Sequence, residues 1–231
     1  MSVAEKMTAI ANAIRNKTGK TDKLSLDEMA TEINEISTGE RDINPEWTDW
    51  SYFCQYRDSL AAKLKYSDTS NGTNFSNMFR DCKKSTSIPA LDTSNGTNFS
   101  YMFYGCGVLT SIPALDTSNG TNFSYMFRFC KALTSIPQLN LTKVTTNKFT
   151  SMFYNCDALV DLNVVGTINA TGLDVSESTL LSHDSLMSII NALADKTGVS
   201  GTRKVILGAT NLAKLTAEEI AIAEGKGWTL A

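Results

Sequence analysis

The chain has 231 residues, of which 42% are hydrophobic and 19% charged, and its formal net charge is −3. This composition is too apolar for intrinsic disorder, and no apolar run approaches the ~20 residues that cross a bilayer, so we expect a soluble globular protein. Residues 1–46, 47–166 and 167–231 carry net charges of −3, +2 and −2, and none of them is basic enough to predict nucleic acid or a membrane as a partner.

Residues 1–37 contain two amphipathic patterns that predict a helical hairpin. The apolar stripes are Val3, Met7, Ile10 and Ile14 in the first helix, and Leu26, Met29, Ile33 and Ile36 in the second. A capping box over Ser25–Glu28 opens the second helix. A hairpin of this size is too small for a core of its own, so we expect it to attach to a larger assembly or to mediate homo-oligomerisation. Residues 38–49 are interpreted as a linker.

Residues 50–166 are organised by a repeat of 24 residues, and such a period decides the fold class. The string LDTSNGTNFSYMF at 91–103 recurs at 115–127, with a near copy at 68–79. The repeat aligns a phenylalanine column with a cysteine column, which we predict to be structural core: Phe79, Cys82, Phe103, Cys106, Phe127, Cys130, Phe153 and Cys156. We expect a divergent first unit in which Tyr52-Phe53 takes the Met-Phe place and Tyr56 the Cys place.

Each unit has two halves joined by the turn-forming string DTSNG, in which Gly96 and Gly120 are able to adopt positive φ. The LTSIPA half at 109–114 predicts a short strand, and the TNFSYMFYGC half at 97–106 predicts a turn or two of helix. One strand, one tight turn and one short helix per unit predict an α/β repeat fold, a leucine-rich-repeat solenoid of about five coils. No unit buries its apolar face alone, so the coils must stack.

Residues 167–231 predict an α/β unit that caps the solenoid. We expect Ser182 to cap a helix, 204–207 to form a strand, Thr216–Glu219 to form the capping box of the next helix, and 228–230 to form a last strand.

The string L-T-S-I-P…D-T-S-N-x-T-N-x-S-x-M-F-x-x-C over about 50–165 resembles the BspA-type leucine-rich repeat of bacterial surface proteins, which also occurs in phages of Firmicutes. That family usually has Val where this chain has Gly72, Gly96 and Gly120, which implies that each coil lacks a buried methyl pair. Residues 9–33 resemble a module of phage tail-associated proteins, and 185–231 resemble the end segment of phage-encoded repeat proteins. The resemblance therefore implies a virion location, in the phage tail, with a bacterial cell surface as the alternative.

No residue pattern in the chain predicts a catalytic site, a cofactor or a metal. His183 is the single histidine and no C-x-x-C pair exists. Repeat-equivalent carboxylates such as Asp92 and Asp116 would share one environment, whereas acid–base chemistry needs two. We therefore predict that the protein is not an enzyme.

Two columns of the repeat leave alternatives open. Stacked coils at ~4.8 Å would bring neighbouring cysteines near disulfide range, but we favour buried thiols because the column follows the phase of Phe and Met. Aspartates 68, 92 and 116 and asparagines 71, 95 and 119 could bind calcium, but we favour side chains that cap the N–H groups of their own turns.

Two surfaces are candidates for binding. The first is a hydroxyl-rich stripe on the strand face, suited to glycans or wall polymers, with a solvated face that binds nothing as the alternative: Thr86, Ser87, Thr110, Ser111, Pro113, Thr134, Ser135 and Pro137. The second combines Tyr and Arg, which are favoured contact residues: Arg80, Tyr101, Tyr104, Tyr125, Arg128 and Tyr154.

These observations predict a non-enzymatic, phage tail-associated receptor-binding protein whose repeat domain contacts a bacterial surface glycan or protein. Other phage tail proteins are the expected partners of 1–37. A structural component of the particle without its own receptor, and a bacterial surface adhesin, are the alternatives.

Overall fold

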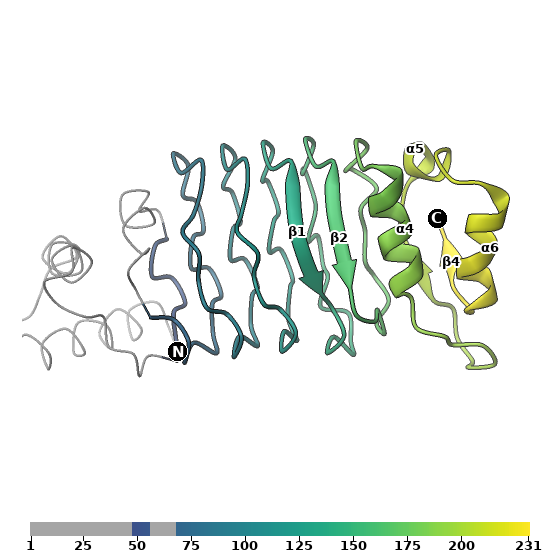
Figure 1. The fold of residues 1–231 in the computed structure, drawn as a ribbon, viewed down its shortest axis with the longest axis horizontal. Coiled ribbons are helices and arrows are strands. Elements are labelled where there is room, and N and C mark those ends of the chain that lie inside the picture. Colours follow the sequence, from purple (N-terminus) through teal and green to yellow (C-terminus); the bar gives the residue numbers. More distant parts are fainter. Residues whose placement is uncertain (1–47, 56–67) are drawn as a thin grey trace, which may run out of the picture.

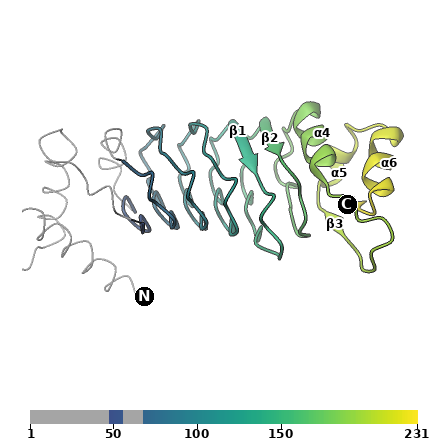
Figure 2. The same ribbon diagram turned by 60° about the horizontal axis from the view of Figure 1, so that its bottom comes forward.

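The computed structural model describes residues 48–55 and 68–231, and the chain there forms a row of coils stacked side by side, with helices gathered at the carboxyl-terminal end (Figures 1 and 2). The hairpin predicted for 1–37, most of the linker 38–49 and the predicted Cys-like place of Tyr56 lie outside the described residues. No helix in the described ranges has the length and apolar character needed to cross a membrane.

Backbone hydrogen bonds join residues that lie one repeat apart. Asn74, Asn98 and Asn122 form consecutive parallel bridges, and the Phe75 N–H donates to the Asn98 carbonyl at 2.9 Å. On the other side of the coil, the Thr110 N–H donates to the Thr86 carbonyl at 3.1 Å. Each coil thus satisfies its backbone polar groups through its neighbours, which is why the repeat must stack to be stable.

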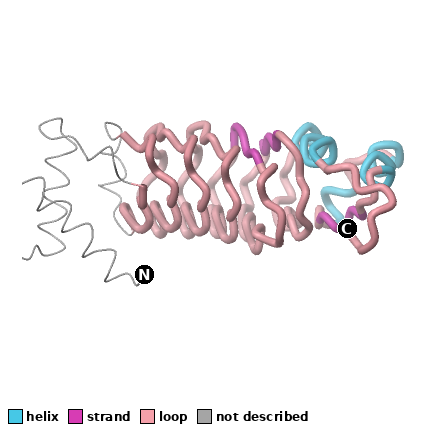
Figure 3. Tube along the Cα trace, turned by 90° about the horizontal axis from the view of Figure 1, so that it is seen from below, coloured by secondary structure: helices cyan, strands magenta, loops and turns pink. Residues whose placement is uncertain are grey.

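Regular strands occupy little of this stack (Figure 3). The parallel strands β1 (Ser135–Asn140) and β2 (Asp161–Val165) pair with each other, but the register is interrupted between Ile136 and Leu139, around Pro137. The strand predicted at 109–114 is reduced to a single bridge between Ser111 and Ser135. Pro113 has no N–H to donate to a ladder, although Pro137 at the equivalent position lies inside β1.

The short helix predicted in each unit is wrong, because this half of every coil is a run of tight turns. The Met102 N–H donates to the Phe99 carbonyl and the Cys106 N–H to the Phe103 carbonyl, whereas the amides of Tyr101 and Phe103 donate to the next coil. This alternation needs left-handed residues, and Tyr101 (φ 58°) and Gly105 (φ 74°) provide them. A helix would withdraw the amides that hold the neighbouring coil. We call this side of the stack, residues 77–84, 101–108, 125–132 and 151–158, the turn wall.

The first unit is aligned one residue later than predicted. The Phe53 N–H donates to the Trp50 carbonyl, as the Met78 N–H does to Phe75, and Cys54 bonds to Met78 as Phe79 does to Met102. Phe53-Cys54 therefore takes the Met-Phe place, because Trp50 takes the place of Phe75 at the start of the turn.

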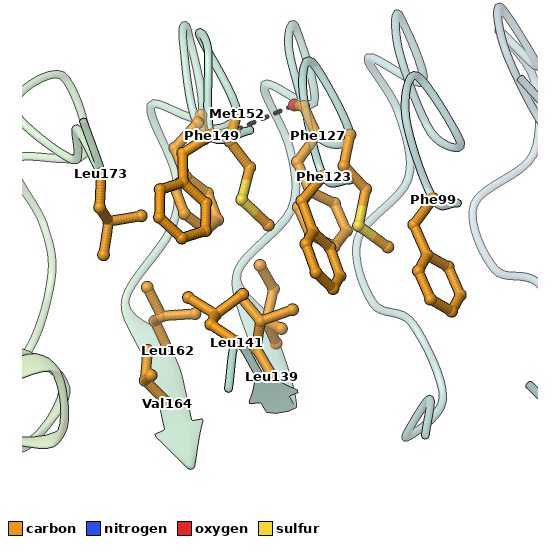
Figure 4. Packing of buried hydrophobic residues seen from close by; sticks show 14 of the residues in the cluster. Phe99, Phe123, Phe127, Leu139, Leu141, Phe149, Met152, Leu162, Val164 and Leu173 are labelled. Carbon is orange, nitrogen blue, oxygen red and sulfur yellow. Dashed lines mark hydrogen bonds between the residues drawn. The ribbon is translucent and has the colours of Figure 1, made fainter. Parts of the chain in front are cut away.

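Two ladders of stacked phenylalanines form the centre of the core. Phe75, Phe99 and Phe123 stack with centroid separations of 5.7 and 5.4 Å, and the second ladder is Phe79, Phe103, Phe127 and Phe153 at 5.5, 5.5 and 5.9 Å. The rings of Phe123 and Phe127 point into the interior toward Leu139 and Leu162 of β1 and β2 (Figure 4). We call the side that carries β1 and β2 the strand wall.

The repeat glycines leave space for rings and do not adopt the predicted positive φ. Gly72, Gly96 and Gly120 have φ values outside the left-handed region, but a Cβ on Gly96 would lie 2.4 Å from Phe99 Cζ. The phenylalanine ring three residues after each of these glycines fills the space that the valine methyl groups of the resembled family would occupy. The last full coil has Val144 at this position and, because of its two-residue insertion, its buried ring is Phe149, five residues later.

The carboxyl-terminal unit closes the stack with α4 (His183–Ala192), α5 (Ala209–Leu212), α6 (Ala217–Gly225) and the parallel pair β3 (Lys204–Val205) and β4 (Thr229–Leu230). The predicted N-cap Ser182 and the predicted capping box of Thr216 with Glu219 are confirmed. Two serines of α4 complete the edge of β2: Ser185 Oγ accepts from the Leu162 N–H at 2.8 Å, and Ser188 Oγ accepts from the Val164 N–H at 3.1 Å. Hydroxyl groups on a helix thus replace the next coil at a strand edge.

Candidate functional site

The hydroxyl stripe predicted as a ligand face lies on the strand wall, where two of its hydroxyl groups bond to the neighbouring coil. Thr110 Oγ1 donates to the Thr86 carbonyl and Thr134 Oγ1 to the Thr110 carbonyl, both at 3.1 Å. Ser87 and Ser111 are exposed, whereas Ser135 is half-buried. The hydroxyl groups of Thr110 and Thr134 therefore bridge coils, although Thr86, Thr110 and Thr134 are themselves exposed residues.

The far end of the strand wall is hollowed into an open groove of about 410 Å³ between β1, β2 and the start of α4. Ser135 and Pro137 of the predicted stripe line it, together with Asp161, Asn163 and Asp184. Its other polar groups already have partners: Asn163 Nδ2 donates to the Pro137 carbonyl at 3.1 Å, and Ser185 and Ser188 hold β2. The remaining predicted residue, Pro113, is half-buried one coil earlier.

The tyrosines and arginines predicted as the alternative contact face are brought into one continuous surface on the turn wall. Tyr101 and Tyr125, one coil apart, stack at 4.6 Å between ring centroids. Tyr104 lies 5.7 Å from Tyr101, and Tyr154 is 39% exposed at the end of the row. Aromatic rings with polar tips that are held in fixed positions are suited to contact a ligand at low entropic cost.

Both arginines lie over rings of this surface. The Arg80 guanidinium carbon is 4.8 Å from the Tyr104 centroid and 5.4 Å from that of Tyr101. The Arg128 guanidinium carbon is 4.5 Å from the Tyr154 centroid and 5.6 Å from that of Tyr125. The cation–π contacts hold the guanidinium groups over the rings, which restricts their positions on the wall.

Sequence reasoning missed Phe129, which joins the two halves of this surface. Its ring lies edge-on to Tyr104 at 5.5 Å and to Tyr154 at 5.7 Å, and the Arg128 guanidinium is 4.8 Å from its centroid. The available sequence signal was an aromatic residue at the repeat position where the preceding coil has Gly105. In the structure Phe129 is half-buried. We call the seven residues Arg80, Tyr101, Tyr104, Tyr125, Arg128, Phe129 and Tyr154 the Arg/Tyr surface.

Three aromatic residues of the Arg/Tyr surface have left-handed backbones. Tyr101, Tyr125 and Phe129 have φ values of 58°, 62° and 65°. In other coils the same positions carry Tyr52 (φ 65°), which lies outside this surface, and residues that tolerate this conformation better, such as Asn77 and Gly105. A bulky residue in such a region costs about 1–3 kcal/mol, and strain of this kind concentrates at functional sites. The fold alone would be better served by Asn or Gly here.

The electrostatics of the turn wall differ from those of the whole chain. The wall contains five basic residues, Arg80, Lys83, Lys84, Arg128 and Lys131, against two acidic residues, Asp81 and Asp157, in a chain of net charge −3. Burial, followed by the neighbouring Tyr125, raises the pKa of Tyr101 above its ordinary value. The Tyr101 hydroxyl is therefore a neutral hydrogen-bonding group at physiological pH.

The cysteine column is a set of buried free thiols. Cys106 Sγ donates to the Phe79 carbonyl and Cys130 Sγ to the Phe103 carbonyl, each at 3.0 Å. Burial raises the pKa of Cys156 to about 12. Such thiols act as small apolar residues with a weak donor, which does not suit a reactive or metal-binding role.

The aspartate column caps its own turns, as predicted: Asp92 Oδ1 accepts from the Ser94 N–H at 3.0 Å, and Asp68 and Asp116 do the same at 2.9 Å. The prediction is wrong for Asn95 and Asn119, whose side-chain amides donate to carbonyls of the preceding coil at 2.7 Å. The amide has a donor that a carboxylate lacks, so it bridges coils. In the described ranges, no group of three or more His, Cys, Asp and Glu side chains is arranged to hold a metal ion.

Comparison with protein families gives one match: residues 46–164 match the family described as Mycoplasma protein of unknown function, DUF285. The matched range covers the described residues from Thr48 to Val164 in β2, and so includes the whole Arg/Tyr surface. No curated protein and no solved structure gives a significant match to the chain.

Proposed function

The chain belongs to the family of Mycoplasma proteins of unknown function, DUF285, and we propose that it acts without catalysis, as a receptor-binding protein whose turn wall contacts a bacterial surface. The observation that carries this proposal is the Arg/Tyr surface. Mutual contacts at 4.5–5.7 Å hold its rings and guanidinium groups in place. Three of its aromatic residues also have left-handed backbones, a strain that Asn or Gly at these positions would reduce.

The proposal includes the nature of the scaffold. The stack of 24-residue coils is a leucine-rich-repeat solenoid in which tight turns replace the expected helix, and the carboxyl-terminal unit is its cap. Bridges between Asn74, Asn98 and Asn122 support this assignment, since they keep the coils in register. A stack held at every coil by backbone bonds presents an extended and rigid contact surface.

The proposal places the protein in the tail of a phage particle, where 1–37 attaches it to other tail proteins or to further copies of itself. This part rests on the resemblance of 9–33 and 185–231 to segments of phage tail-associated proteins. Several copies on one particle would raise a millimolar single-site affinity by 10²–10⁴-fold through avidity. Moderate contacts such as those of the Arg/Tyr surface would then be sufficient.

The turn wall supports binding better than the strand wall, which sequence reasoning placed first. The threonine hydroxyls of the strand wall are committed to the neighbouring coil, and the groove near α4 has most of its polar groups already bonded. Its remaining polar groups are mainly the carboxylates of Asp161 and Asp184, and the Asp184 carboxylate lies 3.9 Å from His183 Nδ1.

The test measures binding of the labelled full chain to a panel of Gram-positive cells and to their purified walls. The turn-wall variant is Tyr101→Asn/Tyr125→Asn, which places in both coils the residue that Asn77 has at this position. The matched strand-wall variant is Ser111→Glu/Ser135→Glu. We expect wall binding by the parent chain, loss of at least tenfold in affinity in the turn-wall variant and full binding by the strand-wall variant.

The outcomes separate the competing functions. Because Asn tolerates a left-handed backbone, the turn-wall variant should fold with the stability of the parent chain or slightly more, so that lost binding does not reflect unfolding. Loss in the strand-wall variant alone would move the receptor site to the other face. A folded parent chain that binds no cell and no wall would refute the receptor-binding role and favour a structural component of the particle.

A further inference from the structure

One position of the turn wall alternates in charge from coil to coil. Counting along the stack, it is occupied by Arg80, Tyr104, Arg128 and Tyr154. Each arginine lies over the tyrosine of the following coil, at 4.8 Å for Arg80 over Tyr104 and 4.5 Å for Arg128 over Tyr154. The wall therefore repeats a guanidinium backed by an aromatic ring every second coil.

The two arginines differ in how far their charge is neutralised. Arg80 lies 3.4 Å from the Asp81 carboxylate, and its Nη1 donates to Asn77 Oδ1 at 3.2 Å. The Nε atoms of both arginines are buried without a hydrogen-bond partner, but Arg128 makes no ion pair within 4 Å in the described part of the chain. An unpaired guanidinium held against three rings is a strong site for an oxyanion, because guanidinium forks bind phosphate and carboxylate in a bidentate manner.

Acidic groups gather at one end of this site, and at the other end Asp81 lies 3.4 Å from Arg80 and 3.9 Å from Lys83. Beyond Tyr154 the wall meets a small cavity lined by Asp174 and Glu177, and the Glu177 carboxylate accepts from the Asn155 N–H at 2.9 Å. On the other side, Lys83, Lys84 and Lys131 add positive charge. An anionic chain that lies on the wall is thus favoured over the stretch from Arg80 to Arg128 and disfavoured past Tyr154.

We propose that this column binds an extended polyanion of the bacterial wall whose phosphate groups recur along the chain, with Arg128 as the principal anion site and Arg80 as the second. The inference rests on the proposed wall-binding function and specifies its ligand class. Parallel backbones lie ~4.8 Å apart, so the two arginines are separated by about 10 Å along the stack. The ligand is therefore one whose phosphates are spaced by a sugar or polyol unit, with Tyr104 against the apolar face of that unit.

A nucleic acid fits this column less well. Its phosphates recur every ~3.4 Å of rise along each strand, and unpaired bases need free aromatic faces for stacking. The faces of Tyr101 and Tyr125 are already stacked on each other at 4.6 Å. Nucleic acid binding is retained as an outcome of the test.

The experiment measures the affinity of the full chain for purified Gram-positive walls before and after hydrofluoric acid treatment, which cleaves phosphodiesters. The variants are Arg128→Gln and Arg80→Gln, and the control is Lys204→Gln, which removes one exposed positive charge from β3. Competitors are polygalacturonate, which carries carboxylates only, and a single-stranded oligonucleotide at equal anion concentration. Thermal melting of each variant checks that it folds.

We expect the acid treatment to weaken wall binding by at least tenfold and Arg128→Gln to weaken it by about tenfold. Arg80→Gln should have a smaller effect because Asp81 already neutralises that arginine, and Lys204→Gln should have none. Unchanged binding after the acid treatment, or full binding by Arg128→Gln, would overturn the inference while wall binding itself stands. If polygalacturonate or the oligonucleotide displaces the chain from the wall, the ligand class would be a polycarboxylate or a nucleic acid instead of a phosphate polymer. A parent chain that binds no wall would refute the proposed function itself.

Discussion

The relation between a repeat glycine and the phenylalanine three residues later allows a quantitative test of how this core is packed. A Cβ at Gly96 would lie 2.4 Å from Phe99 Cζ and 3.1 Å from Phe75 Cδ2. The Gly96 φ lies outside the left-handed region, so a side chain there meets a packing conflict and no backbone conflict of that kind. Gly96→Val should therefore destabilise the chain by about 1–3 kcal/mol through overpacking.

Phe99→Ala removes a fully buried ring that stacks on Phe75 at 5.7 Å and on Phe123 at 5.4 Å. Its expected cost is about 3–5 kcal/mol. In the double variant the valine methyl groups occupy part of the space vacated by the ring, while the 2.9 Å approach of the Cβ to the Thr93 carbonyl oxygen remains. We expect the double variant to be more stable than the sum of the single effects by at least about 1 kcal/mol.

Urea unfolding of the full chain, followed by circular dichroism, measures these free energies when the m-values agree among variants. Phe99→Leu replaces Phe99→Ala in the cycle if the alanine variant is unfolded in water. Phe103→Ala provides the matched control, because Phe103 is buried in the other ladder and Gly96 does not face it. We expect the effects of Gly96→Val and Phe103→Ala, the control pair, to add within about 0.5 kcal/mol. If the effects of Gly96→Val and Phe99→Ala add equally well, the valine does not fill the space of the ring, and this account of the packing is refuted.

The buried thiols and the edge of β2 give two further predictions. The pKa of Cys156 is raised from 9.0 to about 12 by burial, so the unfolded chain loses this proton first, and the stability due to this group is complete below pH 9 and is lost as the pH rises toward 12. Chemical denaturation over this pH range should show a decline in the free energy of unfolding that Cys156→Ala makes shallower. A thiol reagent at pH 8 should label no site of the cysteine column in the folded chain, and rapid labelling would contradict the burial of the column. Ser185→Ala leaves the buried Leu162 N–H without its 2.8 Å acceptor and should lower the free energy of unfolding in urea by about 1–3 kcal/mol. The control Thr202→Ala, at an exposed site of the same unit, should change it by no more than about 0.5 kcal/mol. Equal stability of the two variants would show that Ser185 does not complete the sheet.

The sequence predicted the features that depend on local signals or on exact repetition. The period of 24 aligned Phe103 with Phe127 and Cys106 with Cys130, and the structure buries all four. The caps at Ser182 and Thr216 follow from the hydrogen-bonding chemistry of hydroxyl groups at helix starts, which needs no tertiary information.

The helix in each unit was mispredicted because two structures share one apolar spacing. Phe99, Met102 and Phe103 have the i, i+3, i+4 spacing of a helical stripe, yet tight turns with left-handed residues at Tyr101 and Gly105 point the same three side chains inward. The difference lies in the amides that bond to the next coil, and those partners are about 24 residues away. Local periodicity does not contain that information.

The Arg/Tyr surface was only partly predictable. Its tyrosines and arginines are visible as repeat variants, but the stacking of Tyr101 on Tyr125 and the placement of Arg128 over Tyr154 depend on the separation and offset of the coils. Phe129 was missed because residues at its position in other coils, Gly105 and Asn155, are not aromatic. Conversely, the strand-wall threonines looked available because the sequence does not show that their hydroxyl groups bridge coils.

The most direct test of the turn wall as the binding surface is photo-cross-linking to purified Gram-positive walls. A benzoylphenylalanine replaces either Tyr154, which is 39% exposed on the turn wall, or Ser111, which is exposed on the strand wall. The account predicts that irradiation attaches the chain to the wall from position 154 and not from position 111. Attachment from position 111 alone would contradict it and would place the receptor on the strand wall.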